Sequence, residues 1–213
     1  MINLFFLELC NFLLSNSNAI IRILEILIPF ATIHFFVNQQ IALANQMSII
    51  DPLIIWMITF WLQIFSVDMI WGEYLPINWW RLSKYGLGLC SFIRIIAFYV
   101  IYQFLPIVII FTASYTHFNT TFYIIFFQCQ ITCLCVTSIL GIILNNQNLS
   151  DRYIGLFLLP LIVPLSMIPF IYFFSLNALL GKQFIELSFG LLLLTLLITP
   201  KALELLINQK RIL

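Results

Sequence analysis

Six stretches of the chain are apolar over about 20 residues, the length that an α-helix needs to cross the hydrocarbon core of a membrane. They lie near residues 20–37, 49–71, 91–113, 120–144, 153–176 and 186–207. The chain is 63% hydrophobic and only 8% charged, which is too little charge to cover a soluble domain of 213 residues. The sequence therefore predicts one all-α domain over residues 1–213, a polytopic membrane helix bundle with six transmembrane helices.

The basic residues predict how these spans are oriented. With the N-terminus in the cytoplasm or an organelle matrix, Lys182 is the single basic residue on the outer side, and the other eight of the nine lie inside. Lysine and arginine gather on the inner side of membrane proteins. We therefore expect both termini inside. The net charge of +1 gives no reason to expect a nucleic-acid partner.

Residues 1–18 precede the first span and are too short to cross the membrane themselves. Four polar residues of segment 2–15 share an arc of about 140° on a helical wheel: Asn3, Glu8, Asn11 and Ser15. This pattern predicts an amphipathic helix that lies in the membrane interface. The alternative is a frayed apolar tail. Because no basic residue precedes the segment, we do not expect a cleaved signal peptide.

The short motifs of common enzyme chemistry are missing from the sequence. It has no G-x-x-x-x-G-K-[ST] phosphate loop, no H-E-x-x-H, no C-x-x-C and no G-x-S-x-G. No charged residue lies at the centre of a predicted span, although proton relays and ion paths need ionisable groups at membrane depth. We therefore predict no catalytic residue and expect the energy for any transport to come from a partner.

Three of the five cysteines fall in the fourth predicted span, at Cys129, Cys133 and Cys135. No histidine or carboxylate lies in the same span, so we interpret the three as small packing residues and expect no metal site. Glutamine, threonine and serine side chains within the spans either bond neighbouring helices together or line a path for an amphipathic substrate, and the sequence leaves both open.

The two histidines are candidate haem contacts. His34 lies near the outer end of the first span, and His117 lies in the outer loop between the third and fourth spans. Both could face the same aqueous compartment, and imidazole is a haem ligand. The alternative is that each is an interfacial histidine with its polar tip in water.

Loop 72–90 is the longest inner connection and reads GEYLPINWWRLSKYGLGLC. Arg81 and Lys84 share one face of a predicted short helix, with Trp79 and Trp80 nearby. One interpretation is an aromatic belt with snorkelling cations. The other is a helix across the membrane face that docks a soluble partner.

The fifth span contains the run GLFLLPLIVPLSMIPFIYFF, in which Pro160, Pro164 and Pro169 each remove a backbone donor. Pro160 and Pro164 lie about 40° apart on the helical wheel, and Pro169 lies about half a turn away. We predict a helix that is bent or broken over its middle third. Such backbone is tolerated only where neighbouring helices or a wet cavity satisfy it.

Several stretches resemble, in order along the chain, motifs of the haem exporter protein B family. The run LPLIVPL at 159–165, followed by SMIP, resembles its Leu-Pro-Leu-x-Ile-Pro-Leu signature. The runs LEL at 7–9, PLIIW at 52–56 and LP at 105–106 resemble its motifs in the entry helix, second span and third span. The resemblance covers most of residues 7–176. Loop 72–90 has the position of the family's acidic loop but not its residue identities.

The resemblance implies an ABC-2-type permease, the membrane subunit of an ABC transporter in c-type cytochrome maturation, with six spans preceded by an interfacial helix. It implies an ABC ATPase docked on the inner face near loop 72–90 and a second membrane subunit that handles haem. Haem would be the transported or handled species and not a stably bound cofactor.

Two other functions remain open from the sequence: a structural membrane subunit of a respiratory complex, and a twin-arginine-type translocase subunit. The 22 phenylalanines, with many isoleucines and asparagines, indicate an AT-rich genome. Because we see no presequence, we expect an organelle-encoded protein of the mitochondrial inner membrane. A bacterial inner membrane is the alternative.

Overall fold

The computed structural model is helical throughout the part of the chain that it describes, which comprises residues 2–15, 24, 28, 52–53, 55–60, 86–113, 118–146, 151–175 and 178–209. Its elements are α1 (Ile2–Ser15), α5 (Leu87–Tyr99), η1 (Val100–Phe104), α6 (Leu105–Ala113), α7 (Thr120–Asn146), α8 (Asp151–Ser175) and α9 (Ala178–Gln209). No strand occurs among these residues, so the all-α prediction is confirmed for them.

Three helical stretches are long and apolar enough to cross a membrane: Leu87–Thr112, Thr120–Ile143 and Gly181–Asn208. They contain 26, 24 and 28 residues, or about 36–42 Å at 1.5 Å per residue. They match the spans predicted near 91–113, 120–144 and 186–207. Helix α8 covers the region of the fifth predicted span. Most of the first two predicted spans lies outside the described residues, so the structure supports a membrane-embedded bundle without testing the count of six.

The third span is built from α5, η1 and α6 in succession, and its centre is a π-helical turn over Val100–Phe104. The N–H of Leu105 donates to the carbonyl of Val100, five residues back. Pro106 follows directly and has no N–H for the carbonyl of Tyr102. A wider turn beside a proline is a usual way for a helix to continue past the missing donor.

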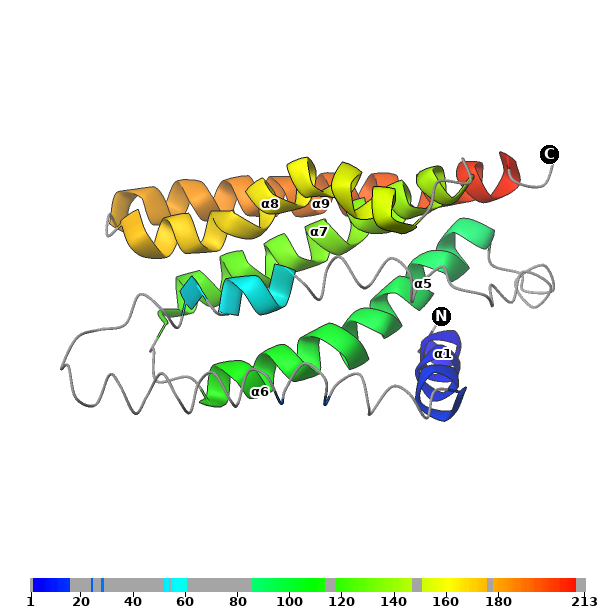
Figure 1. Ribbon diagram of the computed structural model, residues 1–213, viewed down its shortest axis with the longest axis horizontal. Helices are drawn as coiled ribbons and strands as arrows, with labels where there is room; N and C mark the ends of the chain where they lie inside the picture. The colour runs from blue at the N-terminus through cyan, green and yellow to red at the C-terminus, as the bar shows by residue number, and fades with distance from the viewer. Residues whose placement is uncertain are drawn as a thin grey trace.

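Figure 1 shows how these helices are arranged. Helix α7 packs against both α8 and α9, and α5 packs against α9 and α1. The long helices run along the long axis of the view, whereas α1 is seen almost end-on beside the start of α5. Both α1 and the C-terminal end of α9 lie at this end of the bundle, which we call the terminal end.

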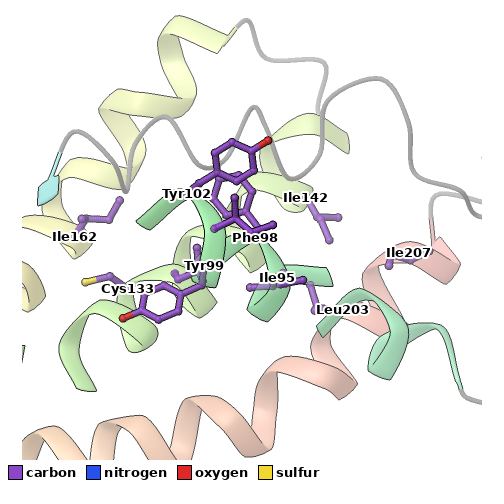
Figure 2. Packing of buried hydrophobic residues seen from close by; sticks show 12 residues of the cluster. Ile95, Phe98, Tyr99, Tyr102, Cys133, Ile142, Ile162, Leu203 and Ile207 are labelled. Carbon is purple, nitrogen blue, oxygen red and sulfur yellow. The ribbon is translucent and has the colours of Figure 1, made fainter. Parts of the chain in front are cut away.

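Two clusters of buried side chains form the core. The mixed cluster joins α5, η1, α7, α8 and α9 through twelve residues, many of which Figure 2 labels: Ile95, Ala97, Phe98, Tyr99, Ile101, Tyr102, Cys133, Leu134, Ile142, Ile162, Leu203 and Ile207. The aromatic cluster joins residues 55–60, α6, the segment just before α7, α7 itself and α8 through seven others: Ile55, Ile107, Ile110, Phe118, Phe122, Phe126 and Phe170. The mixed cluster includes the end of α9 and so lies nearer the terminal end.

Helices α5 and α9 approach closely at Gly88. A Cβ atom at this position would overlap the carbonyl oxygen of Pro200 and would lie 2.9 Å from the Cβ of Glu204. Only a residue without a side chain fits there, because backbone atoms of α9 occupy the space. Small residues at such contacts are what allows helices to pack tightly within a membrane.

The helix predicted for segment 2–15 is confirmed, and of the polar residues on its arc Asn3 is exposed whereas Glu8 is not. Helix α1 forms, but Glu8 is buried and only 4% exposed. Ile2 and Phe6 are exposed instead, at 73% and 58%. The helical wheel alone does not show that α1 packs on α5, and Glu8 is buried in the folded chain.

Candidate functional site

The proline helix α8 is the element to which the sequence motifs pointed most directly. It continues as one α-helix from Asp151 to Ser175 through Pro160, Pro164 and Pro169. The prediction of a break is therefore wrong, and its alternative of a bend remains, since the ribbon of α8 changes direction part-way along (Figure 1). Each proline deletes one hydrogen bond of the ladder, and the remaining bonds together with packing against α7 maintain the helix.

The two faces of α8 differ in what they contact. Its buried face, at helical spacing, carries Ile162, Ser166, Pro169 and Phe170. Its exposed face carries Pro164, Met167, Ile171 and Phe174. Pro164 and Pro169 thus lie on opposite faces, as the wheel predicts, and the side chain of Pro160 is outside the described part of the structure. One of the three prolines therefore belongs to the core, and another faces the surroundings of the chain.

A hydrogen bond on the buried face links α8 to the helical residues 55–60. The indole N–H of Trp56 donates to the hydroxyl oxygen of Ser166 over 3.0 Å, and the Ser166 hydroxyl donates to the carbonyl of Val163, also over 3.0 Å. Ser166 is only 1% exposed. The two partners are 110 residues apart in the sequence, so this contact fixes two distant parts of the bundle against each other.

Aromatic and aliphatic side chains surround this contact. Ile55, next in sequence to Trp56, and Phe170, four residues after Ser166, are buried in the aromatic cluster. The ring of Trp56 stacks on that of Phe60 at 5.5 Å between centroids. In such an apolar setting, water does not compete for the indole N–H, and loss of either partner leaves a buried polar group unpaired.

Most other buried polar side chains with printed partners also bond the helices themselves. The Ser188 hydroxyl of α9 donates to Oε1 of Gln128 on α7 over 2.5 Å. The hydroxyls of Thr132, Thr137 and Ser138 donate to carbonyls of their own helix. Of these four bonds, the one between Ser188 and Gln128 joins two helices and supports the helix-to-helix role, whereas the three bonds within α7 support neither of the roles that the sequence left open.

The cysteines behave as packing residues. Cys90, Cys129, Cys133 and Cys135 are buried and free, and Cys10 on α1 is exposed. The thiol of Cys135 on α7 lies near the hydroxyl of Thr199 on α9. Among the residues that the structure describes, no group of three or more His, Cys, Asp or Glu side chains could hold a metal ion.

The remaining predicted site residues lie outside the described residues: the haem-contact candidates His34 and His117, and the docking candidates Trp79, Trp80, Arg81 and Lys84. The end of loop 72–90 is nevertheless placed. A Cβ atom on Gly86 would lie 3.5 Å from Oε1 of Glu204, near the C-terminal end of α9. The loop therefore reaches the bundle at its terminal end, beside the start of α5.

Comparison with known proteins finds no matching family model, no matching curated protein and no matching solved structure. The likeness to the haem exporter protein B family rests on the motifs quoted above. The structure adds one relation between them, because Trp56 closes the PLIIW run and Ser166 follows the LPLIVPL run. Sequence reasoning identified both runs but did not predict that they contact each other. The features that could have indicated the contact are the indole donor of Trp56 and the single serine, Ser166, between two prolines.

Proposed function

We propose that this chain is the membrane subunit of an ABC transporter complex that handles haem during c-type cytochrome biogenesis. In this proposal it is a six-span permease of the ABC-2 type and is not itself an enzyme. A partner ATPase hydrolyses ATP on the inner face, and the permease couples this hydrolysis to release of haem or of a loaded haem chaperone.

The single observation that supports the proposal best is the hydrogen bond between Trp56 and Ser166. These residues belong to two of the four stretches that resemble the family, and in the folded chain they form one buried contact. A chance likeness between short runs gives no reason for distant runs to meet. A shared architecture does give such a reason, because motifs that recur together tend to pack together.

The partners in this proposal follow from the chemistry that the chain lacks. No phosphate-binding loop is present, so the motor is a separate subunit, and loop 72–90 is the proposed docking site. Gly86 lies beside Glu204 at the terminal end, which would then be the inner, ATPase-facing end. The haem-handling membrane subunit would sit beside the permease in the mitochondrial inner membrane or, alternatively, in a bacterial inner membrane.

The proline helix offers the first test of this function. We would replace Pro160 and Pro164 together with alanine and measure c-type cytochromes by haem staining and by their absorbance. Alanine restores two N–H donors, so α8 should straighten and cytochrome c assembly should fall while the chain still inserts. Normal c-type haem in a variant present at native levels would contradict the proposed role of this helix.

The docking loop offers a second, independent test. Arg81→Glu with Lys84→Glu reverses two charges on the proposed inner surface and should weaken co-purification of the ATPase. Lys182→Glu is the matched control, because Lys182 is exposed on α9 at the opposite end from the terminal end. Equal recovery of the ATPase from the double variant and the control would contradict the docking role and favour the alternative, an aromatic belt with snorkelling cations.

A further inference from the structure

Helix α1 packs on α5 through a face that combines apolar and charged side chains. Phe5, Glu8 and Leu9 are spaced i, i+3 and i+4, so they share one side of the helix. Phe5 and Leu9 pack against the mixed cluster, and Glu8 is 4% exposed. The one carboxylate of α1 is therefore enclosed between α1 and the bundle.

A carboxylate enclosed in this way needs a compensating charge, because burying an unpaired charge is expensive. Helix α1 packs on α5, on which the guanidinium of Arg94 is partly buried and lies within the electrostatic influence of Glu8. Arg94 is the eighth residue of α5 and so lies about 10 Å from the start of the span at 1.5 Å per residue. We expect that depth to lie near the membrane interface. Helix α1, which packs beside the start of α5, can reach it there.

The opposite side of α1 carries no charge. Ile2, Phe6 and Leu7 are exposed at 73%, 58% and 37%, and Asn3 and Cys10 are the exposed residues of other types in the described part of this helix. Such a surface is suited to acyl chains and to the lower headgroup region, with little attraction to anionic lipid.

Apolar packing alone holds α1 weakly in this setting. Within a membrane, lipid tails solvate leucine and phenylalanine about as well as a neighbouring helix does, so the hydrophobic effect adds little to helix association. A charge pair differs, since no lipid tail can replace the partner. The attraction between the charges of Glu8 and Arg94 is thus an interaction that lipid cannot replace.

We infer that Glu8 and Arg94 form a charge latch that fixes α1 to the third span, with lipid covering the outer face of α1. The latch makes α1 and the first half of that span one rigid unit at the terminal end of the bundle. This inference goes beyond the proposed transport function and does not depend on it.

The native chain carries its own reporter for the latch. Cys10 lies on the exposed side of α1, about 200° around the helix from Glu8, and the other four cysteines are buried. A bimane maleimide should therefore label Cys10 alone, and a Cys10→Ser chain should remain unlabelled. The labelled chain is placed in nanodiscs of phosphatidylcholine. Quenching of the bimane fluorescence by brominated acyl chains then reports lipid contact, and quenching by iodide reports exposure to water.

Three variants and one control complete the experiment. Glu8→Gln and Arg94→Gln each leave one charge without its partner, and the exchange Glu8→Arg with Arg94→Glu restores the pair in reverse. Glu186→Gln is the control, because it removes a carboxylate from the exposed pair with Lys182, whose atoms are 3.9 Å apart. Each single variant should raise iodide quenching of Cys10 and speed amide exchange in residues 2–15 by about tenfold or more, and the exchange variant should reverse most of this.

Two results would overturn the latch. One is an exchange variant no better than the single variants. The other is single variants that match Glu186→Gln. If the single variants fail to insert, amide exchange of the native chain still decides, because the latch requires residues 2–15 to be protected as strongly as the start of α5. Free exchange in α1 would identify it as a loosely attached segment.

Discussion

The mixed cluster and the aromatic cluster solve the same packing problem in different ways. In the mixed cluster and beside it, small groups such as Ala97, Cys133 and Gly88 allow α5, α7 and α9 to approach closely. In the aromatic cluster, the rings of Phe118, Phe122, Phe126 and Phe170 fill the space between residues 52–60, α6, α7 and α8. In the view of Figure 1, the cyan helical residues of this segment lie between α6 and α7.

The difference shows what stabilises a bundle whose surroundings are as apolar as its core. Transfer from water contributes little, so the stabilising terms are close packing and hydrogen bonds between helices. At Gly88, close packing comes from the approach of two helix backbones. Around Phe122, it comes from edge-to-face and stacked aromatic rings. Loss of volume should therefore be most harmful in the aromatic cluster, and gain of volume should be most harmful at the α5–α9 contact.

The largest expected effect is the removal of a ring from the aromatic cluster. Phe122 is fully buried and lies 4.2 Å from Phe118 and 5.5 Å from Phe170 between ring centroids. Phe122→Ala should destabilise the chain by about 3–5 kcal/mol, measured by unfolding in mixed micelles. Ile124→Ala is the control on the same helix, because Ile124 is 48% exposed and should tolerate the change. A similarly small loss of stability in both variants would show that ring packing in the aromatic cluster does not stabilise the bundle.

The second expected effect is the addition of volume at the α5–α9 contact. Gly88→Ala places a methyl group against the Pro200 carbonyl, so the two helices must separate, and the expected cost is about 2 kcal/mol. Gly190→Ala on α9 is the matched control, because nothing lies within 4 Å of a Cβ at that site. The control should be neutral or slightly stabilising, since alanine favours helix. Equal stability of the two variants would contradict close approach at Gly88.

The third prediction concerns the hydrogen bond beside the aromatic cluster. Trp56→Phe removes the indole N–H and Ser166→Ala removes its acceptor, and each should cost about 1 kcal/mol. The double variant should cost less than the sum of the two, because the same interaction is lost once. Additive losses in this cycle would show that the two side chains do not interact in the membrane.

The smallest effect is expected for the exposed pair on α9. Lys182 and Glu186 are 85% and 67% exposed, with their charged atoms 3.9 Å apart. Glu186→Gln should change the free energy of unfolding by less than about 0.5 kcal/mol, because water and salt screen such pairs. A large loss would mean that a partner or lipid headgroup encloses this pair in the native membrane.

Features that depend on one segment at a time could be predicted from the sequence. Span length and apolarity locate three of the membrane helices, and the lack of ionisable neighbours marks Cys133 as a packing residue. The wheel also places Pro164 and Pro169 on opposite faces of α8. Each of these follows from helical periodicity and composition alone.

Features that depend on two segments could not be predicted. The wheel gives the angle of Glu8 but not the charge on the neighbouring helix, so its burial against α5 was missed. The contact of Trp56 with Ser166 joins residues 110 positions apart, and a single sequence does not reveal such pairs. Counting lost donors overstated the effect of the prolines, because tertiary packing maintains α8.

The most direct test of the proposed function is purification of the native chain in mild detergent, with mass spectrometry and a haem absorbance spectrum of the eluate. The account predicts recovery of an ABC ATPase together with a haem-handling membrane subunit and a haem signal. Recovery of respiratory-complex or protein-translocase subunits without an ATPase would contradict it. The motif contact at Trp56 and Ser166 would then be a purely structural feature of a different membrane assembly.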